Sequence, residues 1–401
     1  MLPQISKEDV LLAIEHKIGH RNFTILSQAL NPVEEKTGLL GDHYILTISI
    51  QSNVNNQETL LNFFVKAFPV QEALAEFASA SGAFEKEEFS YKLFETYEHN
   101  LIRNCVANCY LIQPNKYLIL ENLGEYIMPN KYECLTYENI LVILRHLAQF
   151  HASTLIFEEK SNKKIIEGNE KIFQDCLYRD GAQFANKNAI ASTLNCILFE
   201  IDYFKFPKKM SSAAETLYKK IFDLVKPSKK FRNVLCHGDL WASNLMLKPD
   251  GCKFVDFQSI RYVPPSHDVL SLIFSTTSRD FRKNHLYELL GIYYNYLEKI
   301  LKISGYNLDK ILPFQEFLES CEEQKLFAIL SAAGIIPLIL SKRELIEKYY
   351  SDKELYYKVF REDRSVLIID NEDNDVFMTR AKESIEDLIE ECTKFCEIKN
   401  C

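Results

Sequence analysis

The chain has 401 residues, 47% of them hydrophobic and 26% charged, with only 12 glycines and 12 prolines. This composition excludes fibrous repeats and long disordered tracts, and the length predicts two lobes with a cleft between them. The formal net charge of −9 argues against a nucleic-acid partner and against binding to an anionic membrane surface, because both favour basic patches.

The beginning of the chain and its apolar runs favour a cytoplasmic protein without membrane insertion. Residues 1–9 lack the features of a secretory signal, and Ser6 with Asp9 predicts a helix capping box. The longest apolar run, residues 326–340, is shorter than a membrane span and predicts a core helix. The 11 cysteines lack the paired spacing of a zinc site, so we expect packing cysteines in a reducing compartment. No obligate protein partner is evident.

In chain order, the first part predicts a helix followed by an antiparallel sheet. Apolar spacing predicts a helix over residues 8–18, and a long helical region over 71–97 follows the third strand. The five expected strands cover residues 24–30, 43–50, 60–66, 104–111 and 117–121. Five strands with a helix inserted after the third are the plan of a kinase-type small lobe.

Beyond a short connector at residues 121–124 the pattern becomes mainly helical. We expect an α+β, two-lobed protein-kinase-like fold, with a five-stranded antiparallel nucleotide-binding lobe at residues 1–122 and a mainly helical catalytic and acceptor-binding lobe at 123–401. Helices are expected near residues 137–154, 171–224, 266–303, 313–341 with a kink at Pro337, 343–359 and 380–397.

The segment that follows residue 236 has the strongest chemical signal. Residues 237–244 read His-Gly-Asp-Leu-Trp-Ala-Ser-Asn and lead into a strand at 245–248, a turn and a returning strand at 252–255. A turn centred on Asp250 would set Lys248 opposite Cys252 and, further out, Asn244 opposite Asp256. We therefore expect two oxygen ligands side by side.

Amide and carboxylate oxygens are donors that magnesium prefers, so Asn244 and Asp256 are the predicted metal ligands. Asp239 lies on the loop before the hairpin, where a carboxylate can accept the proton of an attacking hydroxyl. Polar residues that only cap strands are the alternative interpretation. The combination of HxDxxxxN, a hairpin and Asp-Phe is far more restrictive than any one of these residues alone.

The motif His237-Gly238-Asp239-Leu240-Trp241 with Asn244, and Asp256-Phe257-Gln258, resembles the ecdysteroid-kinase-like branch of the choline-kinase and aminoglycoside-phosphotransferase superfamily. In that family DFQ replaces the DFG of protein kinases. The resemblance implies that ATP is the phosphate donor, that Asp239 is the catalytic base, and that Asn244 and Asp256 hold Mg²⁺. His237 is expected to support the loop. Asp268 either braces the catalytic loop or stabilises a helix N-terminus, and both readings stay open.

The small lobe is expected to contact the nucleotide. Lys66 is a charged residue in an apolar strand, which an exposed edge or a phosphate ligand would equally explain; the downstream motif favours the phosphates. The spacing of the resembled family selects Glu87 as its ion-pair partner, with Glu85 and Glu88 as alternatives on an acidic face.

Two further features of the small lobe complete the expected nucleotide site. Gly38 and Gly41 are candidates for a turn that covers the phosphates. Glu121 and Leu123, in the connector, are expected to contact adenine through their backbone groups. The sequence departs from the family's pattern at His43 and Leu46, where the family commonly has Asn and Ser, and at Asn122, where it usually has Asp.

Together these features predict transfer of the γ-phosphoryl group of ATP to a hydroxyl of a small organic molecule. The resemblance implies an ecdysteroid, a related steroid alcohol or a xenobiotic as acceptor. A choline or ethanolamine kinase, or a nucleotide-binding pseudokinase or scaffold, is the alternative. The acceptor region, expected between residues 158 and 232 and in the C-terminal helices, has no motif that defines a ligand shape.

Overall fold

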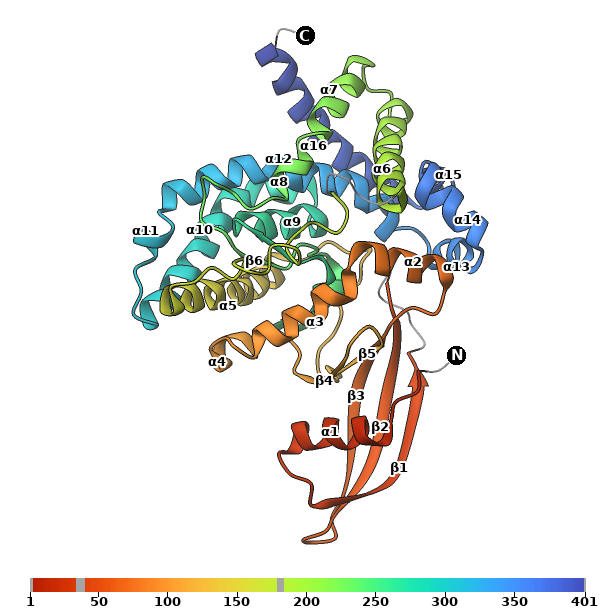
Figure 1. Ribbon diagram of the computed structural model, residues 1–401. Coiled ribbons are helices and arrows are strands. Elements are labelled where there is room, and N and C mark those ends of the chain that lie inside the picture. Colours follow the sequence, from red (N-terminus) through yellow and green to blue (C-terminus); the bar gives the residue numbers. More distant parts are fainter. Residues whose placement is uncertain (1–2, 34–39, 179–183, 400–401) are drawn as a thin grey trace.

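The computed structural model describes residues 3–33, 40–178 and 184–399. Its first part is a five-stranded sheet in the order β1-β2-β3-β5-β4, in which every neighbouring pair is antiparallel. Figure 1 shows this sheet below a larger helical body. The expected α+β, two-lobed kinase-like fold is confirmed. The strands are β1 (Phe23–Pro32), β2 (Asp42–Ser52), β3 (Glu58–Ala67), β4 (Cys109–Gln113) and β5 (Tyr117–Glu121).

Helix α1 (Lys7–Ile18) packs on this sheet through Val10, Ala13 and Ile14, which are fully buried. The predicted cap is present, because the side chain of Ser6 accepts a hydrogen bond from the Asp9 backbone N–H at 3.1 Å.

The long helical region expected at 71–97 is divided. Gly82, with φ of 68°, ends α2 (Glu72–Ser81) and precedes α3 (Ala83–Phe94). A left-handed residue cannot continue a helix, and glycine adopts this conformation without a steric penalty. The break lets α3 run toward the large lobe while α2 lies beside the C-terminal helices (Figure 1). One further turn, α4 (His99–Ile102), precedes β4.

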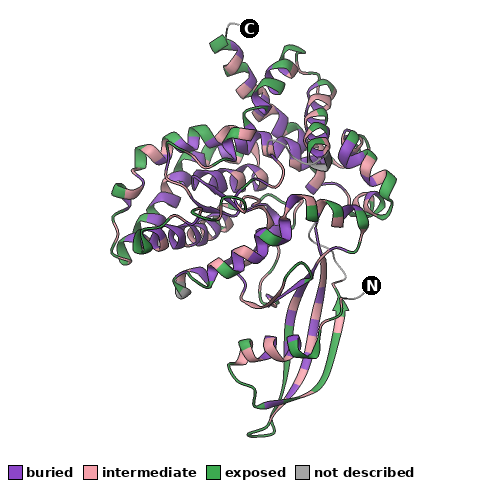
Figure 2. Cartoon of the chain, in the orientation of Figure 1, coloured by how far each residue is buried: buried purple, intermediate pink, exposed green. Residues whose placement is uncertain are grey.

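The remainder is mainly helical. Buried residues that form its hydrophobic core are distributed through the whole helical body (Figure 2). The expected helix at 266–303 is two helices, because Ser278 caps the second one with its side chain. In the described part, the helix expected from residue 171 begins only at Phe184. Pro337 lies inside α12. The helices are α5 (Tyr137–Ser161), α6 (Phe184–Tyr203), α7 (Lys209–Tyr218), α8 (Ile221–Leu224), α9 (Ser266–Thr276), α10 (Arg279–Ile303), α11 (Leu308–Ile311), α12 (Phe314–Ile339), α13 (Arg343–Ser351), α14 (Lys353–Tyr357), the π-helix η3 (Lys358–Glu362), α15 (Val366–Ile369) and α16 (Asp375–Lys399).

By length and composition, helix α5 could cross a membrane. Helices α12 and α13 taken together are also long and apolar enough, but they are bent by 85° relative to each other. However, 72% of the apolar window of α5 is buried inside the protein, where it packs against α10 and β8. Burial of this kind is typical of a core helix.

The residues that the structure describes also form two sheets of two antiparallel strands each. Strand β6 (Val234–Cys236) pairs with β9 (Arg261–Val263), and β7 (Leu245–Lys248) pairs with β8 (Gly251–Phe254). The 3₁₀ turns η1 (Ala242–Asn244) and η2 (Phe257–Ser259) flank the second pair.

The predicted register of the β7–β8 hairpin was wrong by one residue. Lys248 pairs with Gly251 and not with Cys252, because a two-residue turn closes the hairpin. Asn244 therefore faces Val255, whose N–H donates to the Asn244 carbonyl at 3.1 Å. Asp256 follows in the left-handed region, with φ of 70°.

Candidate active site

Lys66 lies at the centre of the nucleotide side of the site. It is only 3% exposed, and its Nζ lies 2.5 Å from Glu87 Oε2 and 2.9 Å from Asp256 Oδ1. Burial lowers the pKa of Lys66, but the carboxylates of Asp256 and Glu87 outweigh burial and raise it, so the ammonium group stays charged. Lys66 of β3 thus links α3 and the segment after β8 through ion pairs. Among Glu85, Glu87 and Glu88, it is Glu87 that pairs with Lys66.

Asp239 and Asn244 are held together by the loop between β6 and β7. The Asn244 amide nitrogen donates to the Asp239 carbonyl at 2.7 Å and to Asp239 Oδ2 at 3.2 Å. Burial, together with the nearby charge of Asp256, raises the pKa of Asp239 to about 7 against the lowering effect of Arg261. A carboxyl group with a pKa near neutrality is well matched to accepting a proton.

The catalytic loop is braced by Asp268 at the start of α9. Its carboxylate accepts the backbone N–H groups of His237 at 2.6 Å and Gly238 at 2.9 Å, and it lies 3.1 Å from His151 Nε2. Burial raises the pKa of Asp268, yet these neighbours, led by His151, bring it down to about 2. Of the two readings, the geometry favours the loop brace. The Nε2–H group of His237 donates to the Val255 carbonyl at 2.8 Å, so His237 also supports the loop.

A second brace reaches the loop from β9. Arg261, 4% exposed, lies 2.5 Å from Asp175 Oδ2 through its Nε and donates to the Gly238 carbonyl through Nη1 at 2.5 Å. Burial lowers the pKa of Arg261, but Asp175 raises it, so the buried ion pair stays intact. Gly238, with φ of 81°, tolerates no side chain there, because a Cβ would lie 2.1 Å from the Ser259 carbonyl oxygen.

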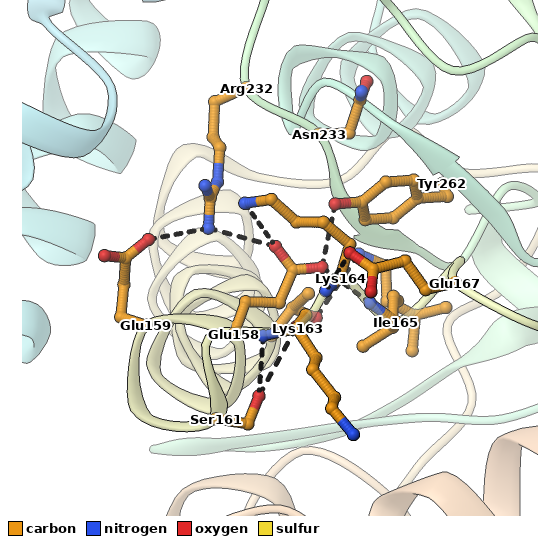
Figure 3. Close-up of polar contacts among 12 residues, drawn as sticks. Glu158, Glu159, Ser161, Lys163, Lys164, Ile165, Glu167, Arg232, Asn233 and Tyr262 are labelled. Carbon is orange, nitrogen blue, oxygen red and sulfur yellow. Dashed lines mark hydrogen bonds and ion pairs between the residues drawn. The ribbon is translucent and has the colours of Figure 1, made fainter.

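The next residue of β9, Tyr262, is anchored on its other face by Glu158 at the end of α5. The buried Glu158 carboxylate accepts from Tyr262 Oη at 2.8 Å, from the Ile165 N–H at 2.9 Å and from Lys164 and Arg232, as Figure 3 shows. Strand β9 is therefore held by hydrogen bonds on both of its faces. Because Arg261 of β9 also bonds to Gly238, this network restrains the catalytic loop as well.

Two cavities meet at the catalytic loop. The nucleotide-side pocket has an empty volume of about 870 Å³ and is lined by Lys66, Glu87, Asn244 and Asp256. The acceptor-side pocket has an empty volume of about 1200 Å³ and is lined by Asp239 together with residues of α2, α6, α12 and the segment around η3. The Asp239–Asn244 hydrogen bond crosses from one pocket to the other.

The connector and the glycine turn are only partly as expected. Glu121 and Leu123 line the nucleotide-side pocket with Asn122. The Glu121 carboxylate is held by Lys253 at 2.8 Å and by Asn108, so its side chain belongs to the scaffold. Gly41, with φ of 110°, lies against Lys66, since a Cβ there would be 3.3 Å from Lys66 Cε. Gly38 lies outside the described residues.

Two of the three departures from the family pattern, at His43 and Leu46, lie on strand β2 in different surroundings. His43 pairs with Lys66 across β2 and β3 and lines the nucleotide-side pocket. Leu46 is 2% exposed and packs in the core of the sheet. Of these two residues, only His43 therefore lines the pocket.

The donor set fits a divalent cation. Asn244 uses its amide nitrogen for Asp239, which leaves its Oδ1 for a ligand, and Asp256 offers a carboxylate beside it in the same pocket. Hard oxygen donors of this kind, few in number, suit Mg²⁺ that also binds phosphate oxygens and water. Asp256 is held by Lys66 and by Gln258, whose Nε2 donates to Oδ2 at 3.0 Å.

Comparisons with known proteins agree with this arrangement. The model of the ecdysteroid kinase-like family matches residues 40–306, which is more than half of the chain. The chain belongs to the ecdysteroid kinase-like family. It is thus a member of a kinase-like phosphotransferase family. No curated protein matches it.

Solved structures similar to this family member are distant in sequence. The gentamicin complex of APH(2'')-IIa has 13% identity over 94% of this chain and 99% of its own, with a TM-score of 0.42. ADP-bound aminoglycoside phosphotransferase APH(2'')-Ib has 15% identity over 94% and 99%, with a TM-score of 0.40. Choline kinase from Cryptosporidium parvum Iowa II has 12% identity over 96% and 98%, with a TM-score of 0.36.

Several residues of the site were not foreseen from the sequence. Asp175 and Arg261 are 86 positions apart, and nothing local links them. The buried position of Arg261 within a short strand is the one signal that could have singled it out, because a charged residue in an apolar strand needs a partner. Arg361 and Arg364, which line the acceptor-side pocket, lie in a segment without any motif.

Proposed function

We propose that this family member transfers the γ-phosphoryl group of ATP to a hydroxyl of a small organic molecule. The observation that carries the proposal is the junction of the two pockets, where Asp239 lines the acceptor side and the Asn244 bonded to it lines the nucleotide side. A hydroxyl bound beside Asp239 would have the phosphate-binding groups directly across the loop.

In the proposed reaction the hydroxyl oxygen of the acceptor attacks the γ-phosphorus, and a new P–O bond forms. The bond from the γ-phosphorus to the bridging oxygen breaks and ADP leaves. The proton of the hydroxyl passes to the Asp239 carboxylate. Lys66, positioned by Glu87, would neutralise the phosphates. Asn244 and Asp256 would hold Mg²⁺, which supplies charge neutralisation of the phosphate oxygens when bound.

The acceptor-side pocket favours a molecule with an apolar body. Its lining includes Leu74, Phe77, Ile335 and Leu338. A steroid alcohol such as an ecdysteroid, or a hydroxylated xenobiotic, fits this lining. Choline or ethanolamine fits it less well, because Arg361 and Arg364 in its lining would repel a cationic headgroup.

We place the reaction in the cytoplasm. The ten cysteines that the structure describes are all free thiols, seven of them buried. Free thiols persist in reducing compartments.

The test is mass spectrometry of reactions that contain ATP, Mg²⁺ and a panel of hydroxylated steroids, plant phenols and choline. Asp239→Asn is expected to lower the transfer rate by at least about a thousandfold while ATP binding is retained, because the proton acceptor is lost and the phosphate-binding groups remain. Asp223→Asn, at an exposed position, is the matched control. Wild-type turnover in Asp239→Asn would remove Asp239 as the base, and ATP binding without any product would favour a scaffold.

A further inference from the structure

The acceptor-side pocket carries a positive charge that the transfer reaction does not use. Of the described residues that line it, Arg261, Arg361 and Arg364 are cationic and only Asp239 is a carboxylate. Arg261 is neutralised by Asp175 from outside the lining. The two other arginines come from the segment at η3, far along the chain from every motif of the active site.

Arg361 is held rigidly against the pocket wall. It is 6% exposed, and its guanidinium lies 4.9 Å from the centroid of the Phe77 ring and 5.6 Å from that of Tyr356. Its Nη2 donates to the Tyr356 hydroxyl at 3.3 Å. Both aromatic residues also line the pocket. Such stacking fixes the plane of the guanidinium, which is the geometry that a planar anion requires.

Arg364 has unused hydrogen-bonding capacity. Its Nε is buried without a hydrogen-bond partner, and among the described residues its side chain forms no ion pair. A buried donor that lacks a partner costs free energy, which an anionic oxygen of a ligand would recover.

The surroundings of Arg361 and Arg364 also favour the binding of an anion. Burial lowers the pKa of Arg361, and the charge of Arg364 lowers it further. The acidic residue Glu76 lies on the adjoining helix, but it is exposed and bonded to Lys353 and Tyr357. Two guanidinium groups three residues apart, on an apolar wall, are stabilised by an anion bound between them. Arg361 lies on the π-helical segment η3, and π-helical turns occur frequently at functional sites.

We propose that the acceptor is an acidic amphiphile, with an apolar body, a hydroxyl that reaches Asp239 and a carboxylate or sulfate bound by Arg364 beside Arg361. This inference rests on the proposed phosphotransfer and specifies its substrate class. The carboxylate is a recognition group and takes no part in the transfer.

The experiment compares acids with their own neutral esters, so that only charge differs. The probes are cholic acid with its methyl ester and 12-hydroxydodecanoic acid with its methyl ester. Binding to the full chain is measured by titration calorimetry without nucleotide, and phosphorylation with ATP and Mg²⁺ is measured by mass spectrometry. In at least one pair, the acid is expected to bind about ten- to hundredfold more tightly than the ester, as a charge-assisted hydrogen bond implies.

Arg364→Gln is expected to abolish this preference by weakening the acid and leaving the ester unchanged, with KM rising and kcat nearly constant. Arg343→Gln is the matched control, because Arg343 is 47% exposed and pairs with Glu347 on α13. Equal binding of acid and ester, a preference that survives in Arg364→Gln, or no binding of either acid overturns the inference. The nucleotide side is assayed separately by ATP titration. Acid binding that depends on Arg364 without phosphate transfer would support the carboxylate site at Arg364 and overturn the proposed function.

Discussion

The nucleotide-side and acceptor-side pockets differ in how their charged groups are paired. In the first, Lys66, Glu87 and Asp256 neutralise one another at 2.5–2.9 Å. In the second, Arg361 and Arg364 lie on a largely apolar wall, and Arg364 forms no ion pair with any residue that the structure describes. If the proposed function holds, the groups for phosphate transfer are organised before any ligand binds, whereas the acceptor would complete the charge pairing on its own side.

The two pockets also differ in their origin along the chain. The first draws on the small lobe, the connector and the β7–β8 hairpin, while the second gathers α2, α6, α12 and the segment at η3. Changes on one side are therefore expected to leave the other side intact, and the following predictions test that separation from the largest effect to the smallest.

Lys66→Met should have the largest effect. It leaves Glu87, 1% exposed, and Asp256 without their cation, so we expect a loss of about 3–5 kcal/mol in the free energy of unfolding. ATP affinity should fall strongly and binding of acceptor probes should not change. Chemical denaturation measures the free energy of unfolding, and calorimetry measures the binding of ATP and of the acceptor probes. Lys7→Met, at an exposed position, is the control. An equal loss of acceptor binding would show that the pockets are not separable.

Asp239 should make stability depend on pH. Its folded pKa of about 7 exceeds the ordinary 3.8, so the folded state keeps a proton that the unfolded state has lost between these values. The stabilisation is present below about pH 4 and is lost as pH rises through 7. Asp239→Asn should then be more stable than wild type by about 2–4 kcal/mol at pH 8 and equal to it at pH 4. Denaturation at both pH values measures this; a pH-independent difference would contradict it.

Gly334→Ala should affect the acceptor side alone. A Cβ at Gly334 would lie 2.5 Å from Thr193 Cγ2, and both residues line the acceptor-side pocket, so α6 and α12 must separate slightly. We expect a cost of about 1–2 kcal/mol and a severalfold increase in the KM of the acceptor, with ATP binding unchanged. Gly291→Ala in α10, where a Cβ meets nothing within 4 Å, should be neutral or slightly stabilising. Similar results for both variants would exclude the packing explanation.

The sequence predicted that the candidate site residues lie close together, because their proximity is encoded locally. Asp239 and Asn244 are five positions apart on one loop, and the hairpin that follows brings Asp256 beside them. The strands and α1 were also predictable, since period-two apolar patterns and a capping box are local signals. The register of the hairpin was not, because a turn shorter by one residue shifts every pairing beyond it.

Only the tertiary structure showed which residues far along the chain support the catalytic loop and line the acceptor-side pocket. Nothing in the sequence pairs Asp175 with Arg261 or sets Glu158 under Tyr262, because buried charges find partners through the fold and not through spacing. The same is true of Arg361 and Arg364, which reach the acceptor-side pocket from a segment more than 100 residues beyond Asp239. The sequence by itself therefore determined the family and the candidate reacting groups, while the packing of the large lobe determined the acceptor-side pocket, since that pocket is a surface made by several helices at once.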